Sequence, residues 1–69
     1  MKFRVYIKEL EFELIDVSTP EKVDFVESAT IIRYVAVRGH QKFETTHRIS
    51  NVVTREEAKE IILQDLNAT

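Results

Sequence analysis

Three glutamates at alternate positions are the first residues whose type and spacing could do chemistry. Glu9, Glu11 and Glu13 would lie on one face of an extended strand, about 7 Å from one to the next. Paired carboxylates can act as general acid and base, but they need a pocket, and the sequence has no glycine-rich loop to build one. We interpret the glutamates as charges that protect an edge strand from aggregation, or as an acidic patch for a basic partner.

The histidines and serines make no stronger case for catalysis or metal binding. His40 falls in an expected turn and His47 on an expected strand, and the chain has no cysteine to complete a zinc site. The serines lie in no nucleophile-elbow motif, and the sequence has no phosphate-binding or dinucleotide-binding fingerprint. The sequence therefore predicts a protein that is not an enzyme and needs no metal or other cofactor.

Basic residues are concentrated in the middle of the chain. Residues 31 to 55 hold five lysines and arginines and one acid, whereas both flanks are acidic. One face of the expected sheet would carry six basic side chains and a single acid, namely Lys2, Arg4, Lys8, Arg33, Lys42, Arg48 and Glu44. If this face binds nucleic acid, the predicted contacts are Arg4, Arg33, Lys42 and Arg48. The net charge of −2 favours the other interpretation, in which these side chains surround an apolar row.

Alternating apolar residues predict a long first strand over residues 2 to 17. The apolar set changes face between Ile7 and Leu10, and no turn-forming residue stands there. We therefore expect a β-bulge or sharp twist near Lys8 and Glu9.

The next segment, residues 22 to 38, follows a turn at Ser18-Thr19-Pro20-Glu21 and has two interpretations. Thr19 and Pro20 could begin a short helix over about residues 20 to 28. A long hairpin is favoured, because one register sets Phe3 opposite Ala36 and Leu10 opposite Ala29, so that both strands change apolar face at the same level. In this register Glu27 faces Phe12.

The remaining elements follow from local signals. Gly39-His40 predicts a type II′ hairpin turn before a third strand over residues 42 to 49, with Ile32 opposite His47. Thr54 and Glu57 form a capping box, which predicts a helix that ends near Asn67. The apolar stripe of this helix is Ala58, Ile61, Ile62 and Leu66.

The predicted fold is α+β, a three-stranded antiparallel β-meander with one C-terminal α-helix packed on one face, in a single domain over residues 1 to 69. The helix can cover only one sheet face. On the other face we expect a homodimer interface formed by Ile31, Val35, Val37 and Tyr6.

The arrangement is similar to the arm-type DNA-binding domains at the N-terminus of phage and transposon integrases, which also place three antiparallel strands before a helix. The shared features are the Arg38-Gly39 turn, the basic strand from Lys42 to Arg48, and the helix opening at Thr54. They cover less than half of the chain, and the long acidic first strand departs from that pattern.

Size and composition favour a binding protein over other classes. A chain of 69 residues without cysteine buries a thin core and has no disulfide to reinforce it, so that oligomerisation is expected. No apolar run is long enough to span a membrane, and a cytosolic location is the default expectation. We expect a small protein-interaction or regulatory module that acts as a homodimer or binds another protein, and is encoded by a phage or mobile element. The alternative is a nucleic-acid-binding module.

Overall fold

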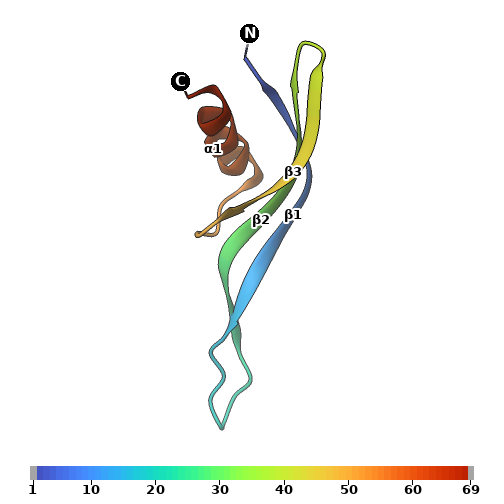
Figure 1. Ribbon diagram of the computed structural model, residues 1–69. Helices are drawn as coiled ribbons and strands as arrows, with labels where there is room; N and C mark the ends of the chain where they lie inside the picture. The colour runs from blue at the N-terminus through green and yellow to red at the C-terminus, as the bar shows by residue number, and fades with distance from the viewer. Residues whose placement is uncertain (1, 69) are drawn as a thin grey trace.

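The protein folds into one open antiparallel sheet with a single helix beside it, as the computed structural model of residues 2–68 describes (Figure 1). Strands β1 (Arg4–Asp16), β2 (Phe25–Arg38) and β3 (Gln41–Ile49) lie in the order β1-β2-β3, and helix α1 (Arg55–Asn67) follows. The predicted fold class is confirmed. The molecule is elongated, with principal extents of 55 × 19 × 16 Å.

The register between β1 and β2 differs from the prediction. Val5, and not Phe3, lies opposite Ala36, and Leu10 lies opposite Ile32. The predicted β-bulge is present, because the register shifts between Ile7 and Glu9. This bulge keeps Ile7 and Leu10 on the same sheet face.

A second register shift lies nearer the tip of the hairpin and was not expected. It falls between Glu13 and Leu14, where Ser28 is skipped, so the two strands do not change face at the same level. Glu27 therefore lies opposite Leu14, and Phe12 lies opposite Thr30.

Both hairpin turns follow from residues with special backbone preferences. Thr19 and Lys22 exchange two backbone hydrogen bonds of 2.8 and 3.2 Å around Pro20-Glu21, which rules out the helix considered for residues 20 to 28. Gly39 has a φ of 60°, and His40 does not share a positive φ. This combination is that of the predicted type II′ turn, and the predicted pairing of Ile32 with His47 is confirmed.

The helix begins where the capping box predicts. The Thr54 Oγ1 accepts the Glu57 N–H at 3.1 Å, and a Glu57 carboxylate oxygen accepts the Thr54 N–H at 3.0 Å. Its buried residues are Ala58 and Ile62, and they join Val5 and Ile32 in the core. Ile61 was predicted to face the core, but it lies outside the core cluster and is 38% exposed, and Leu63 packs there in its place.

The core ends at Thr30, which is fully buried. Its hydroxyl donates to the Asn51 carbonyl at 2.7 Å and accepts the Val53 N–H at 3.0 Å, so it holds the loop before the helix against the sheet. Strand β3 ends with Ile49 opposite Thr30. Beyond this level β1 and β2 continue as an uncovered hairpin over residues 14–28, here named the arm (Figure 1).

Candidate interaction surface

The sheet face away from the helix carries more acids than the sequence predicted. Because of the bulge, Glu9, Glu11 and Glu13 lie opposite Arg33, Ile31 and Ala29, all on this face. The face therefore carries Glu9, Glu11 and Glu13 in addition to Glu44, the one acid that was expected. The prediction was wrong because it assumed that β1 and β2 both change their apolar face at the same level.

Ion pairs neutralise half of the predicted basic side chains. Arg33 lies 3.1 Å from Glu9, and Lys8 lies 3.4 Å from Glu44. Arg48 binds Glu13 across the central strand, and its guanidinium lowers the pKa of that carboxyl. The predicted nucleic-acid contacts Arg33 and Arg48 are thus engaged within the sheet.

The other two predicted nucleic-acid contacts, Arg4 and Lys42, lie at the Gly39 end of the sheet. Lys42 pairs in the sheet with Val37 and Arg4 pairs with Val37 from the other side. A hollow of about 540 Å³ opens here. Its lining residues are Lys2, Arg4, Tyr6, Val37 and Gly39.

The apolar row predicted as an interface is mostly covered. Val35 has 9% of its surface exposed, and Ile31 and Val37 are half-buried. Only Tyr6, at 54%, stands well out of the sheet. The charged side chains that pair across β2 flank this row, and the apolar stems of lysine and arginine commonly cover such a surface.

Six of the large exposed apolar side chains lie on the arm. They are 44–78% exposed, and they are Leu14, Ile15, Val17, Val23, Phe25 and Val26. Sequence reasoning placed these residues in strands but did not identify them as a surface. The available signal was length, because a helix of 13 residues spans about 20 Å and a strand of 13 residues about 43 Å.

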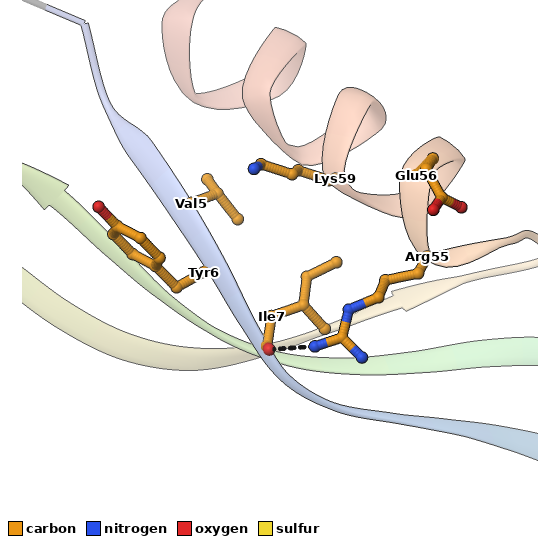
Figure 2. Close-up of a pocket in the computed structure, with 6 residues that line it drawn as sticks. All are labelled: Val5, Tyr6, Ile7, Arg55, Glu56 and Lys59. Atoms are coloured by element: carbon orange, nitrogen blue, oxygen red, sulfur yellow. Dashed lines mark hydrogen bonds between the residues drawn. The ribbon is translucent and has the colours of Figure 1, made fainter.

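A groove runs between the outer edge of β1 and helix α1. It contains two adjoining hollows of about 380 and 240 Å³, which share Val5, Tyr6 and Lys59 in their linings. Figure 2 shows Val5 and Lys59 facing each other across the groove, and the Arg55 guanidinium donating to the Ile7 carbonyl at 2.7 Å. That hydrogen bond shows that the Ile7 carbonyl points out of the sheet at the β1 edge.

Glu11 is the acid of β1 with the least favourable surroundings. A hydrogen bond to Glu9 and the repulsion between the two carboxylates raise its pKa, and Arg33 only partly offsets this. Among the described residues, neither Glu11 nor Arg4 has an ion-pair partner within 4.0 Å.

The histidines lie apart, as the register requires. His40 is exposed in the Gly39 turn, and His47 is half-buried beside Ile32. Within residues 2–68, no three acidic or histidine side chains gather in a way that would hold a metal ion. The helix in that range is too short and too polar to cross a membrane.

These surfaces have to be interpreted from their own geometry. Comparison of the chain with protein-family models, with curated proteins and with solved structures gave no match.

Proposed function

We propose that the protein is a small, non-catalytic interaction module that works as a homodimer. The observation that carries this proposal is the arm. An isolated two-stranded hairpin is marginally stable in water, and a large exposed apolar area is typical of a binding surface. The arm exposes six large apolar side chains and has no covering element of its own.

Charge favours a second copy as the partner. The arm contains four acids and one lysine, whereas the opposite end of the sheet carries Lys2, Arg4, Arg38 and Lys42. An antiparallel arrangement of two copies would bring the acidic end of each toward the basic end of the other. Such complementarity selects orientation and partner more than it adds affinity.

The test is the effect of polar substitutions on the mass in solution. We expect the wild-type chain to be dimeric at high micromolar concentration, and Leu14→Ser/Phe25→Ser to shift it to a monomer, because both side chains are more than half exposed in one copy. Ile61→Ser is the matched control, since Ile61 is an exposed apolar residue on the helix. A wild-type monomer throughout the concentration range contradicts the proposal.

Nucleic-acid binding is the second candidate function, and the hollow at the Gly39 end favours it. Lys2, Arg4 and Tyr6 line this hollow, and a basic surface with an aromatic side chain suits phosphates and stacked bases. The ion pairs of Arg33 and Arg48 restrict this candidate to a small area.

A titration with fluorescent DNA and RNA at low salt tests the second candidate. Binding that weakens steeply with salt, and that Lys2→Gln/Arg4→Gln/Lys42→Gln abolishes, would support it. Arg33→Gln is the control, because its charge is already paired with Glu9. The absence of binding at high micromolar protein would eliminate this function.

A further inference from the structure

Strand β1 has an open outer edge and a charge pattern that reverses along its length. Arg4 and Lys8 lie in its first five residues, and Glu9, Glu11 and Glu13 follow them. A strand of this kind is complementary to itself when it runs antiparallel. We propose, building on the homodimer proposed above, that β1 pairs with β1 of a second copy around a two-fold axis between Lys8 and Glu9, and so joins two sheets into one of six strands.

One register of this pairing sets apolar residues opposite each other on the sheet face that the helix covers. It sets Val5 opposite the partner's Phe12 and Ile7 opposite the partner's Leu10, with Phe3 opposite the partner's Leu14. In one copy Val5, Ile7, Leu10 and Phe12 all pair with even-numbered residues of β2, so they lie on the same face. The β-bulge makes this possible, since without it odd-numbered and even-numbered residues of β1 would face opposite ways.

The same register pairs opposite charges on the other face. Arg4 lies opposite the partner's Glu13, Tyr6 opposite the partner's Glu11, and Lys8 opposite the partner's Glu9. Directly opposed residues of unlike charge stabilise an antiparallel pair, and like charges destabilise it. The Tyr6 hydroxyl and Lys8 would thereby lie opposite Glu11 and Glu9, whose hydrogen bond and mutual repulsion raise the pKa of Glu11.

The backbone at the edge has the orientation that this pairing needs. The Ile7 carbonyl points outward to Arg55, and with the period of a strand the backbone groups of Val5 point the same way. The backbone groups of Leu10 and Phe12 also point outward, because these residues, like Val5 and Ile7, pair with even-numbered residues of β2. Arg55 does not block the pairing, because a carbonyl oxygen has two lone pairs and can accept a second N–H.

The groove between β1 and α1 provides room for the incoming strand. Phe3, Val5 and Leu63 line the smaller hollow, of about 240 Å³. In the proposed register the partner's Phe12 and Leu14 enter it, and these side chains are 37% and 61% exposed in one copy. Arg55, Glu56 and Lys59 line the larger hollow, on the face where the partner's Leu10 would lie opposite Ile7.

The other edge of the sheet is a poorer candidate for self-pairing. Antiparallel pairing of β3 with its own copy, centred on Thr45, sets Lys42 opposite the partner's Arg48. The like charges repel each other. The β1 edge is therefore the one that a second copy fits.

Engineered cysteines test the register directly, because the natural chain has none. In a dimer of Tyr6→Cys/Glu11→Cys, the cysteine at position 6 of each copy faces the cysteine at position 11 of the other. Their Cα atoms are roughly 4.5 to 5.5 Å apart, within the range of a disulfide. Within one chain they stand about 16 Å apart along the strand and cannot bond. We expect mild oxidation to shift this variant from monomer to covalent dimer on a denaturing gel.

The control is Arg4→Cys/Glu11→Cys, in which the cysteines are displaced by one pleat from the proposed register. It should remain largely monomeric on the same gel. A noncovalent dimer in which Tyr6→Cys/Glu11→Cys does not crosslink would overturn the β1 pairing and leave the homodimer standing. A monomeric protein would overturn both. Equal crosslinking of the two variants would overturn the register.

Discussion

The two ends of the long hairpin formed by β1 and β2 have the same kind of sequence but different surroundings. In the helix-covered body, Val5, Ile32 and Ala36 are buried under α1, whereas apolar residues of the arm such as Leu14 and Phe25 are more than half exposed. The difference lies in coverage, since β3 ends at the level of Thr30 and the loop before α1 is held there. An apolar strand residue therefore does not by itself indicate a core.

The largest predicted effect contrasts one side chain from each region. Ile62→Ala should destabilise the protein by about 2 to 5 kcal/mol, because Ile62 is 1% exposed and its removal leaves a cavity. Val23→Ala, at the tip of the arm and 78% exposed, should change the unfolding free energy by less than about 0.5 kcal/mol. Urea denaturation measures both. Equal losses would show that the arm is as well packed as the body.

The boundary between the two regions should be sensitive to the Thr30 hydroxyl. Thr30→Val keeps the shape of the side chain but leaves the Val53 N–H and the Asn51 carbonyl without their partner. We expect a loss of about 1 to 3 kcal/mol in denaturant unfolding. Thr46→Val is the control, as Thr46 is an exposed threonine of β3. If both substitutions are neutral, the hydroxyl does not define the end of the core.

The helix cap should contribute a smaller share. Thr54→Ala removes the oxygen that accepts the Glu57 N–H, and the expected cost is about 1 kcal/mol. Thr54→Ser keeps the hydroxyl and should recover most of the stability, as measured by the denaturation midpoint. An unchanged midpoint for Thr54→Ala would mean that the cap does not stabilise the body.

The smallest predicted effect is the pH dependence of the carboxylates. Arg48 lowers the pKa of Glu13, and the cap hydrogen bonds lower the pKa of Glu57. A lowered pKa in the folded state gives stability that is present above the unfolded value and is lost as the pH falls through the folded value. We therefore expect the melting temperature to fall below about pH 4.5.

Glu11 should act in the opposite direction, because the neighbouring Glu9 raises its pKa. Its contribution to stability is lost as the pH rises through that raised value. Glu11→Gln should therefore raise the melting temperature of the monomer at neutral pH, and the gain should vanish in acid. A constant difference across the pH range would contradict this explanation.

Local signals predicted part of this molecule well. The Gly39 turn and the Thr54 capping box each depend on a few neighbouring residues, and the β2–β3 register and the start of α1 follow from them. The β1–β2 register was wrong because the tip turn is centred on Pro20-Glu21, one residue later than predicted. That error alone moves the pairs by two residues, and the skipped Ser28 moves the pairs from Glu9 to Glu13 by one more. The extra residue at the bulge then brings the glutamates onto the predicted basic face.

The interaction surface could not be predicted from the sequence in the same way. Alternation identified Leu14 and Phe25 as apolar strand residues, but their exposure depends on where β3 and α1 end relative to the hairpin. Val35 shows the converse, since it was predicted to be an interface residue and the neighbouring side chains leave it 9% exposed. Both outcomes depend on contacts between elements distant in the chain.

Amide hydrogen exchange at two protein concentrations tests the proposed self-pairing most directly. We expect the amides of the central strand, such as that of Ile32, to be protected equally at low and at high concentration. The outward-facing amides of Val5 and Phe12 should exchange rapidly in dilute protein and become protected at high micromolar concentration, where β1 pairs with a second copy. Rapid exchange of these two amides at both concentrations would contradict the proposed self-pairing.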